Sequence, residues 1–375
     1  MPVLDADGHI HEPEAMYAKL EAEFYPNRPV MVALPADTAA GDGELLWIIE
    51  GKAVPTIAGR GSTGFTLPGS LRSRSKRATV GNQTLEDVPA RLAGMDEIGL
   101  DMQAIFPTMF LISAVENVVL EGALCRAYNN YLSDASARSH GRLKWNALIP
   151  WRDPEAAVTE LRRASDLGAS GIFTMGVIWD RHLSDPMFFP IYQTASDLDL
   201  PVCVHLGWGA PLANQLFSEN AFFCSATIPV IWGFVFAMNS GILGRFPRLR
   251  IGFIETGAEW VPYAINQVRR QYEPPSAAGR ALQIGGRRGI AIDYYRDPVE
   301  WFKEGRAFVT FEADEDLPYL LQHLGEDALM MSTDYPHGDQ SSDANFVTKL
   351  RQRDDVTDRV KQKLLGENAA RFYRE

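Results

Sequence analysis

Four short segments lie far apart in the chain and share one pattern. Each is an apolar, β-branched run that finishes with a carboxylate or an imidazole side chain. They are residues 3–9, 201–205, 250–255 and 329–334. Buried parallel strands appear as short hydrophobic runs, and enzymes built on barrels of such strands keep their chemistry at the strand C-termini. Packing alone gives no reason to place a metal-ligand side chain there four times. The pattern therefore predicts a metal-centred active site on a barrel of parallel strands.

Strand-like and helix-like patterns alternate along the chain at the spacing of βα units. We expect eight strands, at residues 3–9, 102–107, 143–149, 171–175, 201–206, 250–255, 307–313 and 328–334. Between strands lie helical patterns such as the one beginning at Pro154, where Asp153 can cap the helix and Glu155 favours its positive end. The prediction is an α/β fold, a distorted (β/α)8 TIM barrel, forming a single domain over residues 1–375.

Two segments interrupt the alternation. Residues 28–90 are rich in Pro, Gly, Thr and Arg, with a small hairpin expected around 45–52, and residues 274–298 form a second polar insertion. Long connections inside a compact domain are usually lids or binding loops. We therefore expect both insertions to lie over the C-terminal mouth of the barrel, with surface decoration or a dimer contact as the alternative.

The composition limits the classes of binding partner and the cellular compartment that we expect. The 36 basic and 48 acidic residues give a net charge of −12, which argues against a nucleic-acid or anionic membrane surface. No stretch is long and apolar enough to cross a bilayer, and the first residues do not resemble a secretion signal. Three scattered cysteines are too few for a disulfide framework or a Cys-based zinc site. We expect a cytoplasmic protein with a small-molecule substrate, assembled as a homo-oligomer, a dimer.

The expected metal ligands come from three strands. Asp7 and His9 are two residues apart on one strand, so both side chains point to the same face, while His205 and Asp334 end the fifth and eighth strands. One divalent ion takes such a mixture and keeps a position open for water. Zn²⁺, Mn²⁺ and Fe²⁺ all accept this set, and a second ion could also bind. Singly, each residue could be a turn cap or a core histidine; together they favour a metal site.

Several motifs resemble a known family. They are Leu4-Asp5-Ala6-Asp7-Gly8-His9-Ile10-His11-Glu12-Pro13, residues 91–101, 104–108 and 153–157, Ser332-Thr333-Asp334-Tyr335-Pro336-His337, and residues 367–371. With them the chain resembles the amidohydrolase superfamily, in the branch typified by aminocarboxymuconate-semialdehyde decarboxylase and related aromatic-acid decarboxylases. The resemblance spans nearly the whole chain. It implies that Asp7, His9, His205 and Asp334 bind the metal, and that Asp334 also acts in catalysis.

The chain departs from this branch at the sixth strand, where the decarboxylases carry a catalytic histidine. Here the residue is Glu255, which could be a base, a further metal ligand, or a partner that fixes a ligand histidine. His337, three residues after Asp334, is expected in the loop at the barrel mouth as a further catalytic candidate. His11 shares the strand parity of His9 and could line the mouth.

Three functions remain open. The first is a metal-dependent hydrolase of a small organic amide, ester or thioester, since an ion can activate water and the chain has no Gly-x-Ser-x-Gly nucleophile motif. The second is a metal-dependent, non-oxidative carboxy-lyase of an aromatic or unsaturated acid, which the same four ligands would serve. The third is a non-catalytic, metal-stabilised binding protein. Glu255 in place of the histidine favours hydrolysis.

Overall fold

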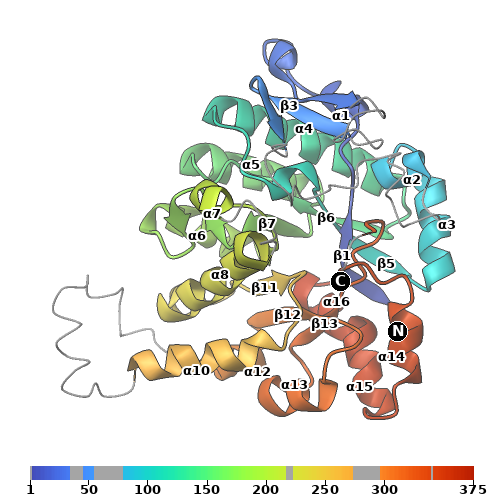
Figure 1. The fold of residues 1–375 in the computed structure, drawn as a ribbon, viewed down its shortest axis with the longest axis vertical. Helices are drawn as coiled ribbons and strands as arrows, with labels where there is room; N and C mark the ends of the chain where they lie inside the picture. Colours follow the sequence, from blue (N-terminus) through green and yellow to red (C-terminus); the bar gives the residue numbers. More distant parts are fainter. Residues whose placement is uncertain (1, 34–44, 55–78, 217–222, 273–295, 339–340) are drawn as a thin grey trace.

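Eight parallel strands form the centre of the molecule (Figure 1). The computed structural model describes all residues except 1, 34–44, 55–78, 217–222, 273–295 and 339–340. The strands are, in their order around the sheet, β1 (Leu4–His9), β5 (Met102–Phe106), β6 (Leu143–Ala147), β7 (Gly171–Met175), β10 (Val202–His205), β11 (Ile251–Ile254), β12 (Ala307–Phe311) and β13 (Leu329–Met331). Each lies within one of the eight expected segments, which confirms the distorted (β/α)8 TIM barrel.

The barrel closes between its first and last strands. The segment after β13 forms a parallel bridge to β1, in which Gly8 is opposite Tyr335. The backbone N–H of His9 donates to the carbonyl of Tyr335 at 2.9 Å, and that of Asp334 donates to the carbonyl of Asp7 at 3.0 Å. The closing contacts therefore tie together the two segments that carry the predicted metal ligands.

The last strand is shorter than predicted. We expected strand structure to continue to Asp334, but β13 ends at Met331. Asp334 has a φ of 53°, in the left-handed region, which ends any regular extended strand. The apolar run therefore identified the strand correctly, whereas its last three residues form the start of the site.

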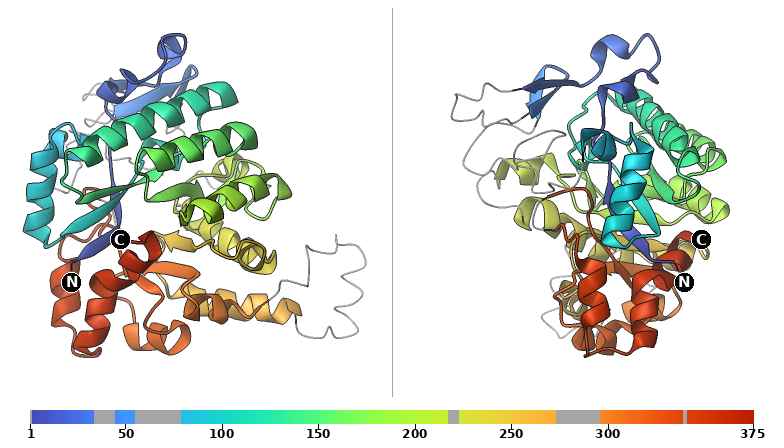
Figure 2. Two further views of the ribbon diagram at one scale, coloured as in Figure 1. Left: turned by 180° about the vertical axis from the view of Figure 1, so that it is seen from behind. Right: turned by 90° about the vertical axis from the view of Figure 1, so that its right-hand side faces the viewer.

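Helices connect the strands and surround the barrel (Figures 1 and 2). The α-helices are α1 (Glu14–Tyr17), α2 (Val80–Thr84), α3 (Val88–Ile98), α4 (Val118–Ala137), α5 (Pro154–Asp166), α6 (Phe189–Leu198), α7 (Pro211–Leu216), α8 (Ile228–Asn239), α9 (Ile242–Arg245), α10 (Trp260–Tyr272), α12 (Pro298–Lys303), α13 (Leu317–Leu324), α14 (Phe346–Gln352), α15 (Asp358–Gln362) and α16 (Asn368–Tyr373). Shorter helical segments are η1 (Tyr25–Asn27), η2 (Met109–Leu111), η3 (Pro186–Phe188), η4 (Phe223–Thr227) and η6 (Lys363–Glu367).

Helix α5 begins as its sequence predicts. The Asp153 side chain accepts a hydrogen bond from the backbone N–H of Ala156, and Pro154 occupies the first turn.

None of the helices in the described part of the chain is long and apolar enough to cross a membrane.

The first insertion contains a small antiparallel sheet, made of β2 (Val30–Ala33), β3 (Leu45–Ile49) and β4 (Lys52–Val54). The expected hairpin is the pair β3 and β4, which turns at Glu50 and Gly51, both with positive φ. A further two-stranded ribbon joins β8 (Val177–Ile178) to β9 (Arg181–His182). Much of both insertions lies outside the described residues, so their position over the mouth stays a prediction.

Candidate metal centre

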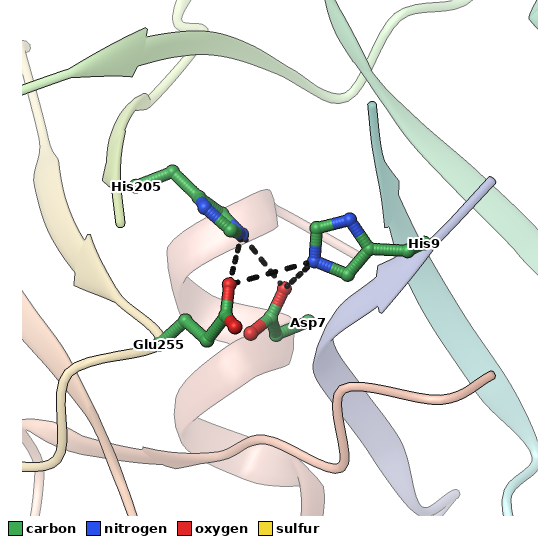
Figure 3. Close-up of side chains that lie close together, drawn as sticks. All are labelled: Asp7, His9, His205 and Glu255. Carbon is green, nitrogen blue, oxygen red and sulfur yellow. Dashed lines mark hydrogen bonds and ion pairs between the residues drawn. The ribbon is translucent and has the colours of Figure 1, made fainter. Parts of the chain in front are cut away.

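Four ligand-type side chains meet inside the barrel (Figure 3). Asp7 and His9 come from β1, His205 ends β10, and Glu255 follows β11. Asp7 Oδ1 lies 3.1 Å from His205 Nε2 and 3.4 Å from His9 Nε2. Glu255 Oε2 lies 3.4 Å from His205 Nε2 and 3.7 Å from His9 Nε2. One atom of each side chain falls within 4.8 Å of the others, close enough for all four to contact one ion.

The backbone orients both imidazoles toward this cluster. His9 Nδ1 lies 2.9 Å from the carbonyl of Pro107, and His205 Nδ1 lies 2.8 Å from the carbonyl of Leu206. Because a carbonyl only accepts, Nδ1 carries a proton in each ring, and Nε2 is left to face the carboxylates. Among the described residues, buried His9 Nε2 has no hydrogen-bond partner. A divalent cation fits this donor set, since it would contact atoms that otherwise face one another as acceptors.

Burial and charge oppose each other in this cluster. Burial would raise the pKa of Asp7, but His205 and His9 hold it well below its ordinary value. Burial would lower the pKa of His205, yet Asp7 and Glu255 raise it overall, whereas burial prevails at His9 and lowers its pKa. A proton on His205 can therefore balance Asp7 without an ion. Protons and a cation then compete for the same place.

An irregularity in β1 gives Asp5 and Asp7 different surroundings. Two residues, Ala6 and Asp7, lie opposite Ala104 alone, so the pairing with β5 is shifted. As a result Asp5 is bonded by Thr333, while Asp7 faces His205 and accepts a hydrogen bond from Ser332 Oγ at 2.9 Å. This irregularity decides which acidic residue reaches the cluster, and no local pattern in the sequence predicts it.

Asp334 borders the cluster of four through the same nitrogen of His9. Its Oδ1 is 3.3 Å from His9 Nε2 and 2.7 Å from His337 Nδ1. The structure thus brings together three of the four predicted ligands, Asp7, His9 and His205, with Glu255. Asp334 instead forms a second group with His9 and His337.

Both carboxylates at the later strand ends have unusual backbones. Glu255 has a φ of 62° and Asp334 a φ of 53°, each about 1–2 kcal/mol less favourable than an ordinary conformation. The Ser341 hydroxyl lies between them, 2.9 Å from Glu255 Oε1 and 3.1 Å from Asp334 Oδ2. A hydroxyl has one proton and donates to one carboxylate at a time. Strain and closely placed carboxylates together are typical of functional sites.

His337 lies in the segment after β13 and is contacted on both sides of its ring. Its Nε2 is 2.9 Å from Thr108 Oγ1, which donates its own proton to the carbonyl of Ile10. Nε2 must therefore be the donor to Thr108. The other ring nitrogen, Nδ1, lies 2.7 Å from Asp334 Oδ1, an ion-pair distance when the ring carries a proton on both nitrogens. The ring also stacks on His9 at a centroid distance of 4.0 Å.

A buried arginine bonds the backbone of the segments that carry His9 and Asp334. Arg91 is fully buried and donates to the carbonyls of His9 at 2.6 Å and Tyr335 at 3.2 Å, and to the Gln103 side chain at 3.1 Å. Burial lowers its pKa to about 10, so it stays charged at neutral pH. The role of Arg91 was missed. The signal was its place at the head of the resembling segment 91–101, because a charge in an apolar helix needs buried partners.

Aromatic side chains border the site beside His205. The rings of Phe106 and Phe173 lie 4.6 and 5.9 Å from that of His205. Beyond Phe173, a pocket opens between the segments that follow β5, β6 and β7, lined by Ile112, Trp151 and Met175 among others. This arrangement agrees with an apolar wall for a small molecule.

Known proteins match almost the whole chain. The amidohydrolase family model matches residues 6–374. Gamma-resorcylate decarboxylase from Polaromonas sp. is 23% identical over 272 residues, covering 67% of this chain and 77% of the relative. The 2-amino-3-carboxymuconate-6-semialdehyde decarboxylase of Dictyostelium discoideum is 23% identical over 297 residues, covering 76% of each.

A solved structure agrees with the fold. It is 5-carboxyvanillate decarboxylase from Novosphingobium aromaticivorans, complexed with manganese and 4-hydroxy-3-methoxy-5-nitrobenzoic acid. It superposes with a TM-score of 0.72 at 19% identity, covering 100% of this chain and 96% of the other. Since the family model extends over nearly all residues, this chain belongs to the amidohydrolase family of enzymes.

Proposed function

We propose that this enzyme is a metal-dependent, non-oxidative decarboxylase of an aromatic or unsaturated carboxylic acid. The observation that carries the proposal is the 2.7 Å contact between Asp334 Oδ1 and His337 Nδ1 beside the metal cluster. The names of the relatives support it, because all three reported above are decarboxylases. The expectation of hydrolysis rested on Glu255 and has no support among these relatives, so we abandon it as the leading function.

Asp7, His9 and His205 would hold one divalent ion, with Glu255 as a further ligand or a partner to the histidines. We propose manganese, since the Novosphingobium relative is complexed with it. When bound, such an ion supplies Lewis-acid polarisation of the substrate carboxylate and a neighbouring oxygen. The acidic side chains here leave little net positive charge, so the ion also makes the site able to accept an anionic substrate.

The Asp334–His337 pair would supply the proton that the reaction needs. Decarboxylation breaks the bond between the carboxylate carbon and the ring or vinyl carbon, and releases CO₂. The electron pair left on that carbon must take up a proton. We propose that Asp334 delivers this proton. His337, which contacts both Asp334 and Thr108, would hold the Asp334 side chain in position.

Turnover with defined acids tests the proposal. The enzyme, loaded separately with Mn²⁺, Zn²⁺ or Fe²⁺, is incubated with 2,6-dihydroxybenzoate, 5-carboxyvanillate and simple unsaturated acids, and CO₂ release is measured. A matched set of aryl esters, thioesters and amides tests hydrolysis. We expect CO₂ release that a chelator abolishes and added metal restores. Ester or amide cleavage without CO₂ would return the function to hydrolysis, and no turnover with the ion fully bound would favour a binding protein.

We also propose a homodimer in a reducing compartment. Helix α8 has no charged residue, although its Trp232 and Phe236 are 39% and 36% exposed. An exposed apolar helix face of this kind supports contact with a second copy. The free thiols of the three cysteines suit a reducing, cytoplasmic setting. Light scattering on the wild type and Trp232→Glu tests the assembly, with a shift to monomer expected for the variant.

A further inference from the structure

A third imidazole continues outward from the metal cluster. His11 follows His9 by two residues and is 2% exposed. Its ring lies 5.2 Å from that of His337, which in turn stacks on His9 at 4.0 Å. The three rings form a row that begins at the metal cluster.

The His11 ring has polar atoms that the described chain does not use. Neither Nδ1 nor Nε2 has a hydrogen-bond partner among the residues that the structure describes. Nearby polar groups are engaged elsewhere: the Glu12 carboxylate accepts the backbone N–H groups of Thr108 and Met109, and Thr108 Oγ1 contacts Ile10 and His337. A buried imidazole without a partner is costly, and such groups are normally satisfied by a bound water or ligand.

The two sides of the mouth differ in what they offer a substrate. His11 offers two unused ring nitrogens at the end of the histidine row, whereas Phe106 and Phe173 present aromatic rings beside His205. A flat substrate with one polar and one apolar side can match both walls only in one orientation.

We infer that His11 is a substrate-positioning residue, which hydrogen-bonds a hydroxyl or second carboxylate oxygen of the acid that is decarboxylated. The inference rests on the proposed function. It adds that the substrate carries an oxygen substituent on the His337 side of the mouth, with its apolar edge toward Phe106 and Phe173. His11 takes no part in bond breaking.

Calorimetry on the manganese-loaded enzyme tests this role with two probes. One is 4-hydroxy-3-methoxy-5-nitrobenzoic acid; the other, 3-nitrobenzoic acid, lacks the two oxygen substituents. For His11→Leu we expect the Kd of the first probe to rise about 10–100-fold, while that of the second changes less than about twofold. His11→Gln, which can still hydrogen-bond, should recover part of the loss. His323→Leu, at an exposed histidine on α13, is the matched control.

The remaining outcomes separate a positioning role from a structural one. Manganese content, measured by mass spectrometry, should stay at the wild-type level in His11→Leu. Equal weakening of both probes, loss of manganese, or an unchanged Kd for the first probe would each overturn the inference. Failure of the wild type to bind either probe would do the same. If His11→Leu raises the Kd of the first probe as expected but the wild type releases no CO₂, the decarboxylase proposal is refuted and the positioning role still stands.

Discussion

Two layers of side chains inside the barrel differ in whether their polar groups find hydrogen-bond partners within the chain. The lower layer includes Cys203, two residues before His205 on β10, whose Sγ donates to Asn146 Oδ1 at 3.3 Å. In the same layer Asn146 Nδ2 donates to the carbonyl of Ile105, and Tyr373 Oη donates to that of Ala6. Each donor there has an acceptor from the chain. In the upper layer, the carboxylates and imidazole nitrogens of the metal cluster face one another at 3.1–3.7 Å.

The difference shows how the fold divides stability from function. Tyr373 belongs to the C-terminal helix α16, which packs against β1 and β13. Its layer is complete as folded, so its bonds contribute only to stability. The upper layer stays electrostatically incomplete until a cation or a proton joins it, and it lies at the strand C-termini, where barrel enzymes place their chemistry. Substitutions in the two layers should therefore have separable effects.

The largest effect is expected for Asp334→Asn in the upper layer. An amide cannot deliver the proton, so kcat should fall about 10²–10⁴-fold, while metal content and the melting temperature stay close to wild type. Steady-state kinetics with parallel metal analysis measures this. A metal-loaded variant with wild-type kcat would remove Asp334 from the reaction.

Glu255 comes next, because it borders the ion rather than delivering the proton. Glu255→Gln should lower metal affinity or turnover about 10–100-fold, as loss of a ligand's supporting partner typically does. Glu255→His sharpens the result, since it restores the histidine of the resembling decarboxylases. CO₂ release should then rise above that of Glu255→Gln. Unchanged metal content and rate in both variants would make Glu255 structural.

The stability of the upper layer should also depend on pH, through Glu312 at the end of β12. Burial, together with the Glu315 and Glu255 carboxylates, raises the pKa of Glu312 from 4.5 to about 8. A raised pKa means that the neutral carboxyl stabilises the fold fully below pH 4.5 and that this contribution is lost as the pH rises to about 8.

Glu312→Gln isolates this effect, since the amide does not titrate. Between pH 5 and 8, the metal-free wild type should lose on the order of 2 kcal/mol of unfolding free energy relative to the variant. Denaturant unfolding at several pH values measures the difference. Parallel pH profiles for the two proteins would show that Glu312 is ionised in the fold at neutral pH.

The smallest effect is expected in the lower layer. Tyr373→Phe removes the hydroxyl that donates to Ala6, which should reduce the unfolding free energy by about 1 kcal/mol. Metal content and kcat should not change. If kcat instead falls as far as it does for Asp334→Asn, the two layers are coupled and the division between them is wrong.

Local patterns in the chain predicted the strands and most of the cluster. Most barrel strands are short apolar runs, and Asp7, His9, His205 and Glu255 stand at or near the C-terminal ends of strands. Parallel strands bring their C-termini to one end of the barrel, so those side chains had to approach one another. This inference needed only periodicity and topology, which are visible without coordinates.

The exact partners were decided by contacts between distant parts of the chain. The shifted pairing in β1 directs Asp7 rather than Asp5 to the cluster, and Asp7 bonds Ser332, 325 residues away. The backbone turn at Asp334 places it beside His337 instead of in the cluster of four. Strand irregularities and left-handed turns depend on how neighbouring segments pack, because buried charges settle where partners exist. No local pattern carries that information.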